Sequence, residues 1–445
     1  MVKNMTEGNP FRLILGFALP LLAGNLFQQT YNLADAAIVG RYLGAESLAA
    51  VGASSSVQFL VLGFCIGICC GFAIPVTQRF GAKDYTQMRR YIFQSAVLTA
   101  GFGIVLTTVC ALLCPQILHL LSTPENIYTD AYHYLLIIFL GIPFTLLYNI
   151  LAAILRGAGD STTPFLFLIV STFLNIMLDC LCIIVFHWGC AGAAIATVTA
   201  QGISGLLCLY LIYRRFDILK PRRQECRISG KEVCRLLWVG IPMGLQYSIT
   251  AIGSMVMQAA NNGLGSVYVS GFTAGMRIKQ FTLCPFDAIA TAVSNFCSQN
   301  LGARRFDRIR KGVKEGIIIG ATYGVLAGVA LIFGGGLFSQ LFISKSETEV
   351  IAVSARYLRC LGCFYWVIAL LNVTRMTTQG LGYSVRCIAA GFIEMAARIT
   401  VSLVFVPVYG FTAICFADQT AWVSAALYTL PTLFICIRKL EKRES

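Results

Sequence analysis

Residues Leu19 to Gly40 read LPLLAGNLFQQTYNLADAAIVG, an apolar stretch with Pro20 near its start and one carboxylate, Asp35, in its second half. About 20 apolar residues in a helix span the hydrocarbon core of a bilayer. Burying an ionised carboxylate there costs roughly 3 kcal/mol even on insertion scales, so a chain that carries one usually uses it to bind an ion or a proton. This stretch therefore predicts a membrane-spanning helix with a functional charge.

The composition of the whole chain is that of an integral membrane protein, since 57% of its 445 residues are hydrophobic and only 12% are charged. Soluble domains carry about twice that share of charged residues. Twelve apolar runs of membrane-spanning length, separated by short polar turns, predict an all-α fold with twelve transmembrane helices. The runs begin near Arg12, Ser47, Tyr91, Tyr128, Thr163, Cys190, Cys234, Gly271, Gly312, Val350, Arg386 and Thr412.

The net charge of +14 indicates membrane topology and not nucleic-acid binding, because the basic residues fall in alternate loops. One set of loops includes Arg79–Arg90, Arg214–Arg235 and Arg304–Lys314, whereas the opposite set holds only Arg41 and Lys345. Cytoplasmic loops of membrane proteins carry the excess of Lys and Arg. We therefore expect a multi-pass protein of the cell (inner or plasma) membrane, with both termini in the cytoplasm.

The chain contains an internal repeat. The segment VTQRFGAKDYTQMRR, from Val76 to Arg90, matches FCSQNLGARRFDRIRK, from Phe296 to Lys311, at an offset of 221 residues. We expect two pseudo-symmetric six-helix bundles, residues 1–213 and 236–445, joined by a basic cytoplasmic linker, residues 214–235. Because six is even, both bundles insert the same way up, which is the parallel type of repeat found in some transporters.

Several motifs occur in a characteristic order. They are Gln29-Thr-Tyr-Asn-Leu-Ala-Asp35 followed by Val39-Gly40, Gln78-Arg-Phe-Gly-Ala82, Arg156-Gly-Ala-Gly-Asp160 and Trp188-Gly-Cys-Ala-Gly-Ala-Ala194. Together they resemble the multidrug and toxic compound extrusion (MATE) family from about Arg12 to Arg438. The resemblance implies a secondary antiporter that exports organic, often cationic, compounds in exchange for H⁺ or Na⁺ by alternating access, with no cofactor beyond the coupling ion.

Four polar side chains of the first half reach a similar depth from three helices. At 1.5 Å of rise per residue, Asp35 lies roughly 8 Å, Thr197 about 10 Å and Asp179 about 11 Å below the outer ends of their spans. Asn175 shares a helix face with Asp179, because the two are four residues apart. Two adjacent carboxylates cannot both ionise cheaply in low dielectric, so such a pair tends to hold one proton or to bind a neutralising cation.

The family resemblance assigns the same residues, since Asp35, Asn175, Asp179 and Thr197 match positions of the cation or proton site in the amino-terminal bundle of its archaeal and bacterial members. Tyr31 and Asn32 flank Asp35 and are expected to support it. The only metal expected is Na⁺ at Asp35 and Asp179. The alternative is that these groups only hydrogen-bond between helices.

The second half departs from the branch of the family that carries an acidic residue in its seventh span, because residues Ile241 to Asn262 contain none. Glu394 and Arg398 stand at i and i+4, a spacing that favours a neutralising, structural pair. Asp418 is a further intramembrane acid. The departure leaves open whether this half has an ion site of its own.

Asp287 follows Pro285 in the middle of the eighth span, with Arg277 and Lys279 two to three turns earlier. Two roles are open for it, namely facing the transport cavity or forming a local ion pair.

A cavity for flat organic cations requires aromatic and methionine side chains with a few amides. Most aromatic residues of such a chain face lipid or pack in its core, so each candidate competes with that simpler role. The candidates by position are Phe27, Gln28, Gln58, Met257, Gln258, Gln280, Phe281 and Asp287.

Other functions have weaker support. The absence of a G-x-x-x-x-G-K-[ST] motif argues against direct use of ATP. A flippase for a lipid-linked cell-envelope precursor is the main alternative, but it would be expected to carry basic residues within spans of both halves, and none interrupts a span of the first half. A third possibility is an intramembrane enzyme or receptor, but the sequence contains no nucleophile paired with a base to support it. We expect a non-enzymatic monomer whose partners are the bilayer and a small organic substrate.

Overall fold

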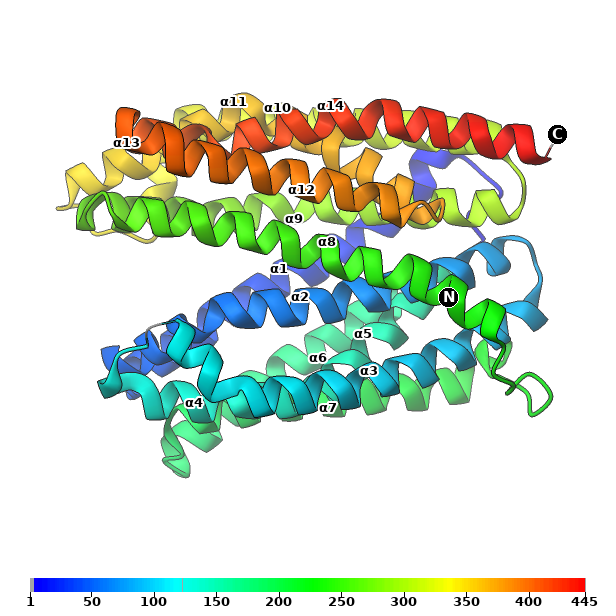
Figure 1. Cartoon of the computed structure of the whole chain (residues 1–445), viewed down its shortest axis with the longest axis horizontal. Coiled ribbons are helices and arrows are strands. Elements are labelled where there is room, and N and C mark those ends of the chain that lie inside the picture. The colour runs from blue at the N-terminus through cyan, green and yellow to red at the C-terminus, as the bar shows by residue number, and fades with distance from the viewer. Residues whose placement is uncertain (1–3, 122, 445) are drawn as a thin grey trace. The chain divides into compact units, whose positions relative to one another are not determined.

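The computed structural model describes residues 4–121 and 123–444, and every regular element in these ranges is a helix (Figure 1). Ten helical segments are each long and apolar enough to cross a membrane, and the bent pair α4 and α5 makes an eleventh. The helix α9 is equally long but more polar. With α9 the described chain has twelve helical passes, and the all-α membrane fold predicted from the sequence is confirmed.

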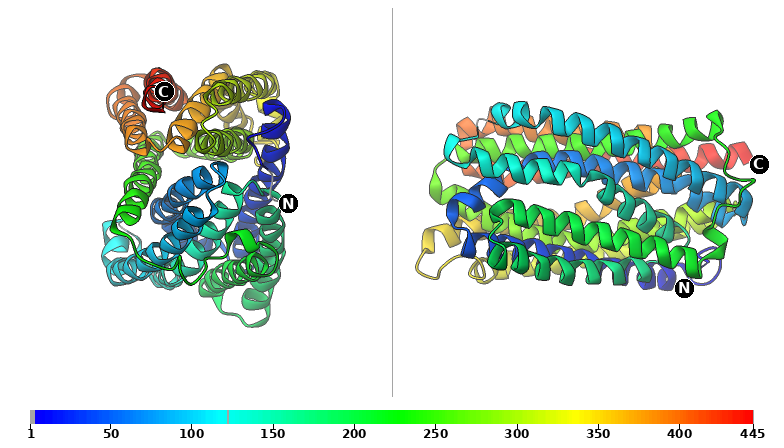
Figure 2. Two further views of the ribbon diagram at one scale, coloured as in Figure 1. Left: turned by 90° about the vertical axis from the view of Figure 1, so that its right-hand side faces the viewer. Right: turned by 90° about the horizontal axis from the view of Figure 1, so that it is seen from below.

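The first half of the chain contains the helices α1 to α7. Figure 2 shows that the long helices within this half run side by side with roughly aligned axes. They are α1 (Pro10–Tyr42), α2 (Ala45–Gly81), α3 (Tyr85–Leu120), α4 (Glu125–Leu140), α5 (Ile142–Gly157), α6 (Thr162–Asp179) with its π-helical continuation η1 (Cys180–Val185), α7 (Gly189–Arg215) and the short η2 (Asp217–Leu219).

The second half repeats this order. Its core is formed around α11, which packs against α9, α10 and α14. The helices are α8 (Gly230–Asn262), α9 (Ser266–Gly302), α10 (Phe306–Ser339), α11 (Thr348–Gly380), α12 (Ser384–Thr400) with its π-helical continuation η3 (Val401–Phe405), α13 (Val406–Tyr409) and α14 (Phe411–Glu444).

The repeat extends to the backbone. The bounds of α2 and α9 differ by the same 221 residues as the repeated sequence, and so do the π-helical starts at Cys180 and Val401. The turns after α2 and α9 each contain a non-glycine residue with positive φ, Lys83 at 58° and Arg304 at 55°. Such a conformation is uncommon for L-residues. Its recurrence at equivalent positions indicates that both halves are built on one template.

The residues form two compact units whose boundaries fall inside helices. Unit 1 includes Ala23–Gly244, and unit 2 includes Met5–Leu22 together with the chain from Leu245 onward. Each boundary lies two residues after a proline, Pro20 in α1 and Pro242 in α8. Proline lacks the N–H that a helix interior needs. The beginnings of α1 and α8 thus belong to different units from the rest of those helices, whereas the sequence suggested a division at the linker 214–235.

The fourth predicted span differs from expectation because it consists of two helices, α4 and α5, bent by 45°. The bend falls at Gly141, just before Pro143, whose missing N–H interrupts the helical hydrogen bonds. A Cβ atom at Gly141 would lie 2.3 Å from Cγ2 of Val198 in α7. Glycine and proline together therefore let the bent backbone pack closely on α7.

A close backbone contact joins α2 to the first part of α8 within unit 1. Gly67 and Gly71 face Gly244 and Gly240, and a Cβ at Gly71 would lie 2.6 Å from the Cα of Gly240. Small residues four apart let two membrane helices approach this closely, where van der Waals packing is strongest.

We predict that Gly71→Ala destabilises the protein by about 1–3 kcal/mol, because the added methyl must push one backbone away from the other. Thermal unfolding of the purified protein in detergent measures the effect. Gly101→Ala in α3 is the matched control, since a Cβ there meets no atom within 4 Å. Equal unfolding temperatures for the two variants would show that the contact is not tight.

The linker between α7 and α8 is held to α3 within unit 1 by buried polar contacts. Arg89 of α3 donates from Nε and Nη2 to the two carboxylate oxygens of Glu225, each at 2.7 Å. Gln94 of α3 hydrogen-bonds to Glu232 at the start of α8. The guanidinium of Arg89 lowers the pKa of Glu225 below its ordinary value of 4.5. The pair fixes the linker to α3 whenever Glu225 is ionised.

A second segment, Met5 to Gly8 before α1, is held in the same way within unit 2. Gln299 accepts the backbone N–H of Met5 at 2.9 Å. Arg305 donates to the carbonyl of Thr6 at 2.8 Å, and Arg308 donates to those of Met5 at 3.1 Å and Gly8 at 2.9 Å. The segments that precede α1 and α8 are therefore each held by residues at or near the repeated turns that follow α9 and α2, respectively.

Glu225→Gln is expected to lower the stability of the protein by about 2 kcal/mol at neutral pH, because it weakens charge-assisted hydrogen bonds. A depressed pKa contributes stability above the unfolded value of 4.5 that disappears as the pH falls through the folded value. The difference in unfolding temperature between wild type and variant should therefore shrink at acid pH. A difference that stays constant with pH would contradict the role of this ion pair, and the exposed Glu46→Gln serves as control.

Candidate functional site

The predicted polar residues of the first half lie on α1, α6 and α7 of unit 1. Asn175 of α6 donates from Nδ2 to the hydroxyl of Thr197 in α7 at 3.3 Å. The carboxyl groups of Asp35 in α1 and Asp179 in α6 lie within hydrogen-bonding reach of each other. Asp179 is completely buried and Asn175 nearly so. Asp35 and Asp179, which are 144 positions apart in sequence, thus belong to one polar cluster, which we call the acid pair site.

The acid pair site presents oxygen atoms that receive no hydrogen bond. Both carboxylate oxygens of Asp179, Oδ1 of Asp35 and Oδ1 of Asn175 are buried without a donor among the residues that the structure describes. An unsatisfied buried carboxylate is costly, and two in contact repel each other. A proton shared between them, or a cation such as Na⁺ bound by these oxygens, relieves both costs.

Local helix geometry helps to build this site. α6 changes from an α-helix to the π-helix η1 directly after Asp179. π-Helical turns are rare and occur mostly at functional sites, because the widened turn leaves main-chain groups and side chains in unusual directions. No pattern in the sequence predicted this change from an α-helix to a π-helix.

Two further residues border the acid pair site. Tyr134 of α4 is buried, interacts with the side chain of Gln58 in α2, and lies close enough to Asp35 for their charges to interact. Tyr31 lies near both Asp35 and Asp179, whereas Asn32 is exposed. Sequence reasoning did not identify Tyr134, although it is the polar member of the buried stripe Ala131, Tyr134 and Ile138 on α4.

The proposed substrate residues are divided between the two units. Phe27 and Gln28 are exposed on α1, and the Phe27 ring lies 6.2 Å from that of Phe165. In unit 2, Gln280 is exposed and Phe281 half-buried, while Gln258 donates to Asn262 at 2.9 Å. Met257 is only 1% exposed and packs in the hydrophobic core of unit 2. Its burial corrects the expectation that it is available to a substrate.

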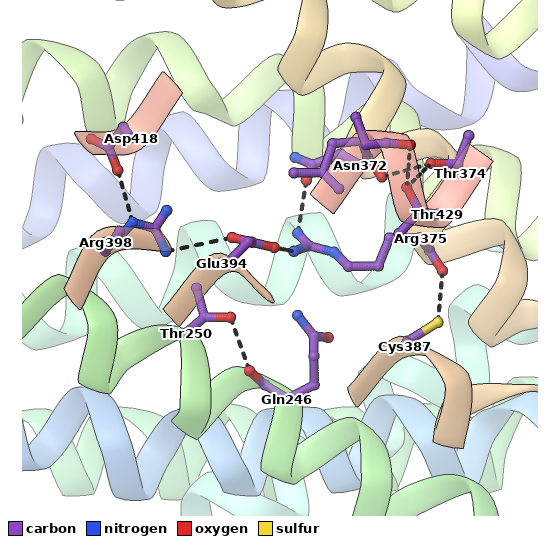
Figure 3. A network of polar contacts seen from close by, with 12 residues as sticks. Gln246, Thr250, Asn372, Thr374, Arg375, Cys387, Glu394, Arg398, Asp418 and Thr429 are labelled. Carbon is purple, nitrogen blue, oxygen red and sulfur yellow. Dashed lines mark hydrogen bonds and ion pairs between the residues drawn. The ribbon is translucent and has the colours of Figure 1, made fainter. Parts of the chain in front are cut away.

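Unit 2 contains a buried network of charged groups in place of a second acid pair (Figure 3). Glu394 lies between two arginines of the network, 2.7 Å from Nη1 of Arg375 and 3.5 Å from Nη1 of Arg398. Arg398 also donates from Nε to Asp418 at 3.1 Å. The pair expected at Glu394 and Arg398 is thus one link of a longer chain of ion pairs across α11, α12 and α14.

Asp418 is the most heavily contacted acid of this network. It pairs with Lys279 of α9 and accepts the hydroxyl of Tyr357 at 3.0 Å. Lys279 therefore does not form the local ion pair considered for Asp287. Instead Asp287 accepts a hydrogen bond from Asn372 at 3.1 Å, and its side chain is exposed.

We expect Asp418→Asn to destabilise the protein by about 3–5 kcal/mol, because Lys279 and Arg398 lose their shared counter-ion in a buried site. The yield of folded protein after detergent extraction and its unfolding temperature measure the loss. Asp307→Asn, at an exposed position in the first turn of α10, is the control. Wild-type stability in Asp418→Asn would show that the network is not needed for folding.

Comparison with known proteins gives consistent matches along the chain. The MatE family model matches residues 20–181 and 242–406. The chain is similar to the probable multidrug resistance protein YpnP of Bacillus subtilis, with 32% identity over 366 residues, 81% of this chain and 80% of YpnP. It is also similar to the probable multidrug resistance protein NorM of Thermotoga maritima, with 24% identity over 442 residues, 97% of this chain and 93% of NorM.

Solved structures with the same fold cover nearly the full length. An outward-facing multidrug resistance MATE family transporter of the MOP superfamily superposes with a TM-score of 0.92 at 22% identity, over 98% of each chain. A MOP superfamily transporter from Pyrococcus furiosus gives the same TM-score, identity and coverage. At this identity the likeness concerns the fold.

Proposed function

Because this chain belongs to the MATE family of multidrug efflux transporters, we propose that it is a secondary antiporter that exports small organic, cationic compounds in exchange for H⁺ or Na⁺. We further propose that it works as a monomer in the cell membrane, with both termini in the cytoplasm. The basic residues in alternate loops support this orientation.

The acid pair site is the observation on which the coupling mechanism rests. Asp35 and Asp179 are in contact, are largely shielded by their neighbours, and receive no hydrogen bond from a described donor at three of their four oxygens. Two adjacent carboxylates gain one cation easily, because the first cation relieves the repulsion between them. Asn175 and Thr197 supply further oxygen atoms for Na⁺, while a proton requires only the carboxylates.

The geometry also suggests how binding is linked to movement. Asp35 lies on α1, in the part of the helix that follows Pro20 and belongs to unit 1. A cation that joins Asp35 to Asp179 draws α1 toward α6, and its release removes that attraction. The ion thereby favours one arrangement of α1 over another, which is the differential binding that coupling requires.

We predict that Asp35→Asn leaves the protein folded and inserted but abolishes coupled export, because an amide neither binds a proton nor repels Asp179. Cells that express the variant should accumulate ethidium to the level of cells without the transporter, whereas wild type lowers it. Membrane abundance and unfolding temperature are measured in parallel. Glu46→Gln removes an exposed carboxylate from the same unit and should behave as wild type. Normal export by Asp35→Asn would reject the acid pair as the coupling site.

A further inference from the structure

The internal repeat locates the positions in unit 2 that correspond to the acid pair site of unit 1. α2 and α9 correspond at an offset of 221 residues, and the glycines just before them, Gly44 and Gly265, have φ values of 90° and 108°. The same offset relates Gly189 at the start of α7 to Gly410 just before α14, with φ values of 58° and 55°. The bounds of α11 correspond to those of α4 and α5 taken together at an offset of 223. These helices can therefore be compared residue by residue.

Three residues that border the acid pair site align with three buried residues of unit 2. The aligned pairs are Gln58 and Lys279, Thr197 and Asp418, and Tyr134 and Tyr357. In unit 1, Tyr134 interacts with the side chain of Gln58. In unit 2, Asp418 pairs with Lys279 and accepts the hydroxyl of Tyr357. The same positions on three pairs of helices thus form a polar site in each half.

The two sites differ in where their charges lie. Thr400 takes the position of Asp179 at the start of the π-helical turn. The position of Asp35 is apolar, because it falls on Val256 when the glycines before α2 and α9 are aligned and on Met257 when the helix prolines are aligned. Unit 2 therefore lacks both acids of the acid pair and instead carries one acid on α14 and a lysine on α9.

The surroundings of Lys279 are those of a bound ammonium ion. Its Nζ pairs with the carboxylate of Asp418, lies 5.5 Å from the ring centroid of Trp422 and is 3.9 Å from Sδ of Met276. A carboxylate and the face of an indole ring both attract an ammonium group. Lys279 is 7% exposed, Trp422 2% and Asp418 1%. The ammonium is thus enclosed on the acid, the ring and the thioether, a set that we call the ammonium cage.

The carboxylate of Asp418 is oriented by residues other than Lys279. Arg398 donates from Nε to its Oδ1 at 3.1 Å, and Tyr357 donates to its Oδ2 at 3.0 Å. Figure 3 shows the guanidinium of Arg398 directed at this carboxylate. Removal of the lysine side chain would therefore leave the acid and the ring of the ammonium cage in place, with space for a small cation between them.

We propose that Lys279 supplies a built-in cation, whose ammonium occupies in unit 2 the position that the coupling ion takes in unit 1. The ammonium cage is a binding site for a primary ammonium ion that the protein fills with its own side chain. The inference rests on the proposed coupling site at Asp35 and Asp179. It explains why unit 2 keeps the framework of the acid pair site, and it assigns exchange of ions with solution to unit 1 alone.

The first test empties the ammonium cage. Lys279→Ala removes the methylene groups beyond Cβ together with the ammonium, which is the volume of one propylammonium ion. Propylammonium should raise the unfolding temperature of the purified full-length variant by about 2–4 °C, because a ligand that binds only the folded state stabilises it. The neutral 1-propanol has the same length and should not. Wild type and Lys314→Ala, which removes an exposed lysine of α10 in the same unit, should show no such rise.

The second test makes the reverse exchange in unit 1. Gln58→Lys places an ammonium beside Asp35 and Asp179. The variant should unfold at or above the temperature of wild type, because the two acids gain a counter-ion. In proteoliposomes it should no longer move H⁺ or Na⁺ against ethidium, because its own lysine takes the place of the ion. Gln224→Lys adds the same charge at an exposed position of unit 1 and should retain both properties of wild type.

Each outcome bears on a separate part of the inference. A response of Lys279→Ala to propylammonium that is no greater than its response to 1-propanol, or than that of wild type, overturns the ammonium cage. Wild-type ion movement or a lowered unfolding temperature in Gln58→Lys overturns the equivalence of the two positions, and this variant decides the question if Lys279→Ala does not fold. Absence of ion movement in wild type rejects the proposed function and the equivalence with it, whereas a failed propylammonium response with ion movement intact overturns this inference alone.

Discussion

The cost of holding charge inside a bilayer determines how this protein is organised. Each unit must neutralise the carboxylates that its helices bring below the membrane surface. In unit 1 the pair Asp35 and Asp179 lacks a basic partner within hydrogen-bonding reach among the described residues, and we propose that a proton or cation supplies the missing positive charge. In unit 2 Lys279, Arg375 and Arg398 neutralise Glu394 and Asp418. In our proposal the first pair is neutralised by an ion from solution, whereas the two acids of unit 2 are paired with basic side chains of the chain itself.

This contrast arises on one repeated framework. The helices α2 and α9 have equivalent bounds, and the π-helical turns η1 and η3 begin at equivalent positions, after Asp179 in one half and Thr400 in the other. The same local geometry therefore presents a carboxylate in one half and a neutral residue in the other. The difference between the halves lies in their side chains, and we propose that unit 1 binds the ion while the charged network of unit 2 stabilises the fold.

Much of the fold could be predicted from the sequence, because apolar length and an internal repeat leave few alternatives. The similar depth of Asp35, Asp179 and Thr197 is a prediction from helical rise alone. Contacts between distant helices were beyond this reasoning. Lys279 and Asp418 are separated by 139 positions, and no local sequence pattern predicts that Lys279 pairs with Asp418 and not with Asp287. The bend at Gly141 and the burial of Met257 likewise depend on packing against other helices.

The most direct test of the account is to measure ion movement during transport. An ethidium gradient is imposed across proteoliposomes, and the fluxes of protons and of radioactive sodium are recorded. The account predicts that wild type moves one of these ions in the direction opposite to ethidium, and that Asp35→Asn and Asp179→Asn move neither. Ion movement in Asp35→Asn equal to that of wild type, or none in wild type, would contradict the assignment of the acid pair site.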